Sequence, residues 1–223
     1  VSIASDNSTS TLAKDGDDIT LTFTASEAIS TPVVTFQSGG AAITDGSIVY
    51  NNTSGNTWTA VYTADANDAA GSITFNISFR DSTGNTGTAI TATTDGTNVT
   101  TDTTAPTLSN VSIASDNSTS TLAKDGDDVT LTFTASESIS TPTVTFASGG
   151  SSINGNVTVQ NTSGNTWTAV YTADANDTDG AVSYSIAFSD TAGNAGSAVT
   201  SGSGSVTTDT TAPTLSNVSI ASD

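Results

Sequence analysis

Residues Ile19–Ala25 read ITLTFTA, an alternation in which every second side chain is apolar and the others are threonine hydroxyls. A period of two is the period of a β-strand, and threonine on the opposite face indicates an antiparallel strand with one buried side. The same alternation recurs in WTAVY at Trp58–Tyr62 and in ITFNISF at Ile73–Phe79. We therefore expect half-buried antiparallel strands, and we find no convincing helical stretch.

Long identical stretches show that the chain repeats itself. VSIASDNSTSTLAKDGDD occupies Val1–Asp18 and Val111–Asp128, and NTSGNTWTAVYTADAND occupies Asn52–Asp68 and Asn161–Asp177. The repeating unit has the length of a domain rather than that of a solenoid repeat. The sequence therefore reads as a section of a longer array. We expect domains at 1–101 and 111–208, linkers at 102–110 and 209–217, and the first strand of a third repeat at 218–223.

Turn signals such as KDGDD, QSGG, TSGN and STGN separate the short alternating segments. About seven short strands in a hundred residues predict an all-β protein of tandem immunoglobulin-like Greek-key β-sandwiches. The strands of the first unit are expected at Val1–Ser5, Asp18–Ala25, Pro32–Gln37, Thr57–Ala64 and Gly71–Arg80, with one or two across Ala42–Asn51 and one within Ala89–Thr101.

Composition excludes several classes of function. The chain of 223 residues carries 22 acidic and 3 basic side chains, for a net charge of -19. This charge disfavours nucleic acid and anionic membrane surfaces as partners, because both need clustered Lys and Arg. No apolar run is long enough for membrane insertion. The absence of Cys and His removes thiol nucleophiles, His-based triads, and ordinary zinc or copper sites.

The strand phase places carboxylates at the end of each sandwich where the chain enters. Glu27 continues the buried row of Ile19–Ala25, and Asp81 continues that of Ile73–Phe79. In an immunoglobulin-like fold these strands lie centrally in opposite sheets and run toward the same end. We therefore expect Glu27 and Asp81 to converge there, joined by Asn85 from the following turn.

The second unit repeats this set as Glu137, Asp190 and Asn194, and the incoming linker adds Asp102. Two carboxylates about 4 Å apart repel by roughly 4 kcal/mol at an effective dielectric near 20, and a bound cation would resolve that repulsion. Oxygen-only ligands on mobile loops favour Ca²⁺ over transition metals. Asp209 is expected to serve a third unit in the same way. Taken singly, each acid has the simpler interpretation of a turn former or a solubilising charge.

A second group of acids lies in the loops at the opposite end of each unit, next to the following linker. A looser cation site shared across the junction and a solvated acidic rim are equally supported there. The run DANDTDG has the wrong spacing for an EF-hand loop and no closing Glu, so that interpretation is rejected. The acids of this group are Asp15, Asp17, Asp18, Asp65, Asp68, Asp125, Asp127, Asp128, Asp174 and Asp177.

Four phrases, DTTAPTLSNVSI, TLTFTASE, VYTADANDTDG and FSDTAGN, together resemble the bacterial immunoglobulin-like repeats of very large surface adhesins, over almost all of both units. They are most similar to the calcium-binding extender repeats of Gram-negative RTX-type adhesins, including the ice-adhesin type. The resemblance implies an extracellular, cell-surface location and a role in holding a binding tip away from the cell. It also implies that the linker Asp, the Glu of SE and the Asp of D-x-x-G-N are calcium ligands.

The leading hypothesis is a structural extender, stiffened by calcium, whose partners are the neighbouring identical repeats. One alternative is a repeat of an extracellular filament or surface layer that associates laterally. Another is a module that binds glycans or a host protein, although Trp58 and Trp167 lie in the buried phase and are expected in the core. We expect no enzyme and no small-molecule substrate, because the paired carboxylates lie at loop ends without an aromatic cleft.

Overall fold

The computed structural model describes residues 1–43 and 46–222. Over these residues the regular structure consists of β-strands. The chain divides into two compact units, one formed by Val1–Ala105 with Thr191–Asn194 and the other by Pro106–Asp190 with Ala195–Asp223. Each unit is described below by itself.

The first unit is a sandwich of two sheets. One sheet has the strand order β1-β3-β7-β6 and the other the order β2-β9-β8-β4-β5. All neighbours pair antiparallel except β2 and β9, which are parallel. The bounds are β1 Ser2–Ser5, β2 Leu12–Ala13, β3 Asp18–Thr24, β4 Val33–Ser38, β5 Ala41–Ala42, β6 Val49–Ser54, β7 Thr57–Thr63, β8 Gly71–Ser78 and β9 Thr100–Thr101.

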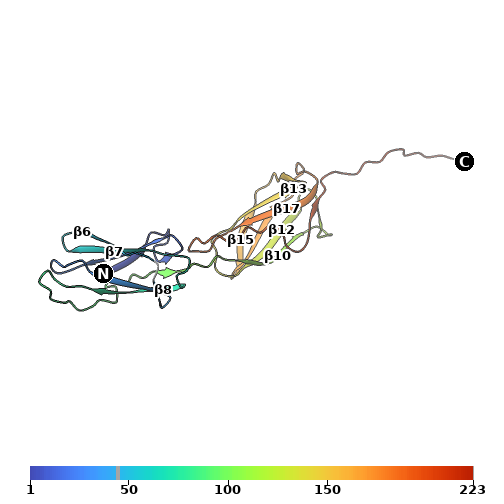
Figure 1. The fold of residues 1–223 in the computed structure, drawn as a ribbon. Coiled ribbons are helices and arrows are strands. Elements are labelled where there is room, and N and C mark those ends of the chain that lie inside the picture. The colour runs from blue at the N-terminus through green and yellow to red at the C-terminus, as the bar shows by residue number, and fades with distance from the viewer. Residues whose placement is uncertain (44–45, 223) are drawn as a thin grey trace. The chain divides into compact units, whose positions relative to one another are not determined.

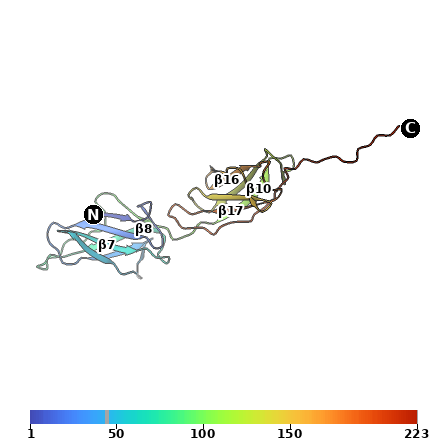
Figure 2. The same cartoon turned by 90° about the horizontal axis from the view of Figure 1, so that it is seen from above.

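The second unit repeats this arrangement, with the sheets β10-β12-β16-β15 and β11-β18-β17-β13-β14. Figures 1 and 2 show the two layers of strands in each sandwich. The prediction of tandem immunoglobulin-like sandwiches is therefore confirmed. The bounds are β10 Leu108–Ser115, β11 Leu122–Ala123, β12 Asp128–Ala135, β13 Thr143–Ser148, β14 Ser151–Ser152, β15 Thr158–Ser163, β16 Thr166–Thr172, β17 Gly180–Ala187 and β18 Thr207–Thr208.

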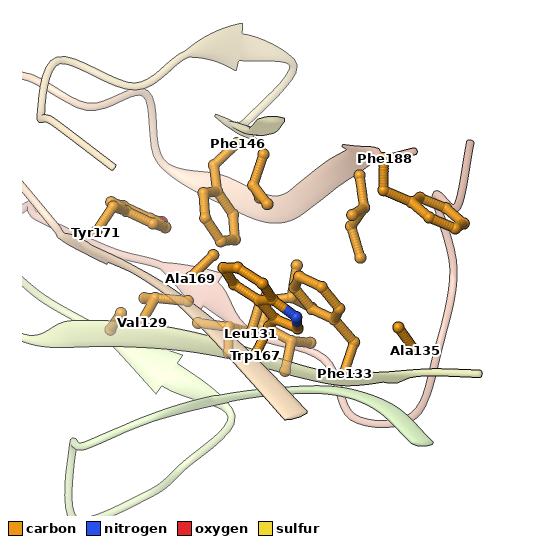
Figure 3. Close-up of a cluster of buried hydrophobic side chains, with 14 of the residues drawn as sticks. Val129, Leu131, Phe133, Ala135, Phe146, Trp167, Ala169, Tyr171 and Phe188 are labelled. Carbon is orange, nitrogen blue, oxygen red and sulfur yellow. The ribbon is translucent and has the colours of Figure 1, made fainter. Parts of the chain in front are cut away.

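The alternating apolar side chains form one core between the two sheets of each unit. On β12 the side chains of Val129, Leu131 and Phe133 are fully buried, while the threonines between them face outward. Figure 3 shows this core, with Phe146 reaching into it from the facing sheet. Trp167 is 8% exposed and belongs to the same cluster. The prediction that this tryptophan is a core residue is therefore confirmed.

The strands differ in detail from the expectation. The described part of each unit contains nine strands rather than about seven, because three of them are only two residues long. The last strand, expected within Ala89–Thr101, is reduced to Thr100–Thr101 plus a single bridge between Ile77 and Ile90. The strand expected across Ala42–Asn51 begins at Val49, and positions 44 and 45 of that range lie outside the described residues.

Gly180 and Asn110 of the second unit both have positive φ angles. Gly180 has φ +141, and a Cβ added to it would lie 2.8 Å from the Cα of Gly149, so the start of β17 and the turn after β13 approach too closely for a side chain. Asn110 has φ +52, at the point where the register of β10 against β12 shifts between Ser109 and Ser112. An Asn in the left-handed region is a recognised way to make such a bulge.

The segment expected to open a third repeat belongs to no sheet over residues 218–222, and residue 223 lies outside the described range. Val218 and Ile220 of this segment are exposed apolar side chains, as is Leu215 in the preceding linker. Figure 1 draws no strand in the chain that follows the second sandwich.

Candidate metal centre

In the second unit, Glu137 and Asp190 lie just beyond the ends of β12 and β17, which are central strands of opposite sheets. A bridge between Ile139 and Asp190 joins the two segments, and Ser140 N donates to Ser189 O at 2.9 Å. One carboxylate oxygen of Glu137 and one of Asp190 lie within 4.8 Å of each other. Asp190 is only 1% exposed, whereas Glu137 is partly exposed. The fold therefore brings together two carboxylates that are 53 residues apart in the numbering.

The first unit places Glu27, Asp81 and Asn85 around one shallow pocket that is also lined by Ile29 and Phe79. Asp81 accepts hydrogen bonds from Asn85 Nδ2 at 2.7 Å and from the backbone N–H groups of Thr83 and Asn85 at 2.9 and 2.8 Å. The bond from Asn85, followed by that from Thr83, lowers the pKa of Asp81 to about 2. Asn85 thus makes the largest contribution to lowering this pKa.

Asp102 begins the linker and is held by its backbone in the first unit. Its N–H donates to Ala13 O at 2.8 Å, which extends the parallel pairing of β2 with β9 by one residue. Its carbonyl accepts from Asn194 Nδ2 at 2.8 Å, and its Oδ1 accepts from Thr104 N at 3.1 Å. Asp209 has the same anchor, because its N–H donates to Ala123 O at 2.9 Å.

The paired carboxylates fit a hard cation. Calcium binds oxygen at about 2.3–2.6 Å, so two ligand atoms of one ion lie at most about 5.2 Å apart. The oxygens of Glu137 and Asp190 meet that limit, since they lie within 4.8 Å of each other. The donors are all oxygen atoms, which suits Ca²⁺ and does not suit soft transition metals.

At the opposite end of each unit, Asp17 and Asp127 take part in a loop network. Asp127 accepts from Asn117 Nδ2 at 2.7 Å, from Lys124 N at 2.9 Å and from Lys124 Nζ at 2.6 Å. The hydrogen bond from Asn117, followed by those from Lys124, lowers the pKa of Asp127 to about 2. Asp17 makes the equivalent contacts with Asn7 and Lys14.

The other acids of that end are hydrogen-bonded within their own loops or to an adjacent strand. Asp18 and Asp128 accept from the hydroxyls of Thr63 and Thr172. Asp65 and Asp174 accept from Asn67 and Asn176, while Asp68 and Asp177 accept from the N–H groups of Asp65 and Asp174. Asp15 and Asp125 are exposed. None of these acids belongs to a group of three potential metal ligands among the described residues, and the looser site stays a prediction.

Asp179, a further acid of the loop at that end, holds the following linker, a role that the sequence pattern does not indicate. Asp179 accepts from Thr210 N at 2.7 Å, from Thr210 Oγ1 at 2.9 Å and from Thr211 Oγ1 at 2.6 Å. The backbone bond from Thr210, with the two hydroxyl bonds, lowers the pKa of Asp179. The first unit has Ala70 at the equivalent position. A comparison of the two units therefore shows that Asp179 is a substitution, but it does not show that Asp179 binds the linker.

Several solved structures match this chain at low sequence identity and low TM-score. A titin I-band fragment, I67–I69, is 12% identical with a TM-score of 0.44; the match covers 94% of this chain and 66% of the fragment. The D00–D0 domain of intimin is 14% identical with a TM-score of 0.31, over 93% of this chain and 99% of that one. No protein-family model and no curated protein matches the sequence. The part of the chain that the structure describes contains no helix long and apolar enough to cross a membrane.

Proposed function

We propose that the chain is a structural spacer of a large bacterial surface adhesin, extracellular in location, in which Ca²⁺ stiffens the junctions between successive sandwiches. The observation that carries this proposal is the carboxylate pair of Glu137 and Asp190, with Asp190 only 1% exposed and the two oxygens within 4.8 Å. Two ionised carboxylates held this close repel each other, and a bound cation would offset that repulsion.

Each proposed ligand has a separate role at the calcium site. Asp190 and Glu137 hold the ion from the ends of two sheets, and Asp102 completes the site from the linker. Support for Asp102 comes from the sequence, which places this carboxylate in the linker directly before the second unit. Glu27 and Asp81 form the equivalent site in the first unit, with Asn85 orienting Asp81. When bound, calcium supplies positive charge that ties the linker to the sandwich that follows.

Two observations favour a spacer over a glycan-binding module. Trp167 is buried in the core, so it offers no flat aromatic face to a sugar. The two units also carry identical stretches at Val1–Asp18 and Val111–Asp128, whereas a dedicated binding domain would be expected to differ from its neighbour.

Calorimetry and X-ray scattering in calcium and in EDTA test the proposal. An ion that binds only the folded protein adds about 2.7 kcal/mol to the free energy of unfolding at a hundred times its dissociation constant. We expect a rise of several degrees in Tm with calcium, since about 1 kcal/mol shifts Tm by roughly 4–8 °C in a domain of this size. We also expect a narrower range of particle dimensions in scattering. Identical Tm values and scattering curves in both buffers would refute the proposal.

A pair of variants assigns the effect to the site. Asp190→Asn removes one charged ligand and should abolish most of the calcium-dependent rise in Tm. Asp116→Asn is the matched control, because Asp116 is exposed on the same unit and lies outside the proposed ligand set. The quantity compared is the Tm difference between calcium and EDTA, so a general loss of stability in either variant does not affect the result.

A further inference from the structure

The loop between β14 and β15 of the second unit contains Asn154 and Gly155, the one place in the sequence where glycine follows asparagine. Asparagine is a thermolabile residue, because the backbone nitrogen that follows it can attack its side-chain amide. The attack is easiest before glycine, which has no Cβ to shield the nitrogen or to restrict the backbone. This loop therefore combines a reactive amide with the least hindered nucleophile that the backbone offers.

Both groups are accessible in the structure. Asn154 and Gly155 are exposed, so water reaches them. Among the described residues, no backbone carbonyl accepts a hydrogen bond from the N–H group of Gly155. The attack on the amide therefore does not have to break a backbone hydrogen bond of its nucleophile.

The side chain of Asn154 holds this loop against the loop between β16 and β17. Its Nδ2 donates to Asn176 O at 2.9 Å and to Asp177 Oδ1 at 3.2 Å, and its backbone N–H donates to the same Oδ1 at 2.8 Å. Asp177 is only 5% exposed, and its Oδ2 accepts from Asp174 N at 3.0 Å. The amide of Asn154 is therefore one of the donors that surround a nearly buried carboxylate.

We propose that Asn154 is a site of spontaneous deamidation, and that the reaction separates these two loops. The nitrogen of Gly155 forms a bond to Cγ of Asn154, and the bond between Cγ and Nδ2 breaks. The proton of the Gly155 nitrogen leaves with Nδ2 as ammonia, which leaves a cyclic imide. Water then opens either carbonyl of the imide and yields an aspartate at position 154 or the isomer whose backbone runs through Cγ. Water is the co-reactant throughout.

The product does not keep the contacts of the asparagine. A carboxylate has no N–H to donate, so the bonds to Asn176 O and Asp177 Oδ1 are lost. The new negative charge also replaces an amide that lay 3.2 Å from Asp177 Oδ1, and two like charges this close repel each other. The isomer in addition lengthens the backbone between the two loops. Conversion should therefore lower the stability of the second unit.

The same contacts set the rate of the reaction. While Nδ2 is bound to Asn176 and Asp177 the side chain of Asn154 is restrained, and local opening of the loops releases it. The peptide SSINGNVTV, which spans Ser151–Val159, lacks these contacts. We expect the peptide to convert faster than the folded chain, and the ratio of the two rates measures how often the loops open.

The first experiment is incubation of the folded 223-residue chain in mildly alkaline buffer below its Tm, followed by digestion and mass spectrometry. The fragment with Asn154 should gain the mass of an amide converted to an acid and should separate into two products. Asn156 is the internal control, because it is exposed in the same loop but is followed by Val157. Gly155→Ala should lose the conversion; the added Cβ would lie 3.2 Å from Thr172 O, which a small shift of the loop relieves.

The second experiment measures the consequence directly. Asn154→Asp should unfold several degrees below the parent chain, because it loses the donated bonds and gains the repulsion. Asn156→Asp is the matched control, since it adds the same charge to an exposed position of the same loop. EDTA is present in both experiments, which keeps the outcome independent of the calcium proposal.

Three results would overturn the inference. The first is a folded chain that keeps the amide of Asn154 after the peptide has converted completely. The second is equal conversion at Asn156, because exposure rather than the following glycine would then govern the reaction. The third is an equal Tm for Asn154→Asp and Asn156→Asp, because the contacts of Asn154 would then not join the two loops.

Discussion

At the scale of single residues, the acids of this chain differ in what they contact. Asp127 is almost buried and accepts from Asn117 and Lys124, whereas Asp125, two residues earlier, is exposed. Two acids of the same loop therefore have different roles: Asp127 makes hydrogen bonds that stabilise the loop, and Asp125 faces water. The amino-acid composition does not distinguish the two residues, whereas their contacts in the structure do.

Asp127 provides a pH-dependent prediction. Its pKa falls from 3.8 to about 2 on folding, so its ionised form is favoured in the folded state. That contribution to stability is present above about pH 4 and is lost as the pH falls toward 2. Asp127→Asn should lower Tm at pH 7, and the difference from the parent chain should shrink on acidification. Thermal unfolding followed by circular dichroism at pH 7, 4 and 2 measures this.

Asp125→Asn is the control for that series, because it removes the same charge from the same loop. Its effect on Tm at pH 7 should be small, because the Asp125 side chain is exposed. A pH dependence equal for both variants would show that net charge, rather than the contacts of Asp127, governs the loop.

At the scale of elements, the structure predicts which glycines can be replaced. Gly180→Ala would place a Cβ 2.8 Å from the Cα of Gly149, at a φ of +141. Gly164→Ala would also be strained, at φ +54, but has nothing within 4 Å. We expect about 1–2 kcal/mol of destabilisation at Gly164 from the backbone alone and about 1–3 kcal/mol more at Gly180 from overlap. Urea unfolding curves of both variants measure the two values, and equal midpoints would contradict the close approach.

Much of the fold could be predicted from the sequence, because the long strands carry a strict period of two. The alternation around Leu21 and Phe75 identifies both the strands and their buried faces. The two-residue strands β2 and β9 carry no such period, and their parallel pairing joins segments nearly ninety residues apart in the numbering. That pairing forms between segments that only the tertiary structure brings together, so no local sequence pattern indicates it.

Part of the candidate site could also be predicted from the period of two in the strands. Extending the buried phase beyond the strands located Glu137 and Asp190, which the structure brings within 4.8 Å. The acids at the opposite end could not be assigned in this way, because their partners come from turns. Asn117, for example, donates to Asp127, and neither residue belongs to the alternating pattern of a strand.

At the scale of the whole molecule, the net charge of -19 opposes compact folding through self-repulsion. NaCl should therefore raise Tm gradually as it screens these charges. CaCl₂ at equal ionic strength should raise Tm further, and the additional rise should saturate, because it reflects occupancy of defined sites. Scanning calorimetry in matched salt series distinguishes the two, and superimposable curves would point to screening alone.

The parallel pairing at the exit of each unit has a mechanical consequence. β11 and β18 lie side by side and point the same way, and Asp209 N continues their pairing with a bond to Ala123 O. A pull on the chain beyond Asp209 drags β18 along the length of β11 instead of peeling it away. The hydrogen bonds between them are then loaded together in shear and must break almost at once, so the short contact resists force more strongly than its length suggests.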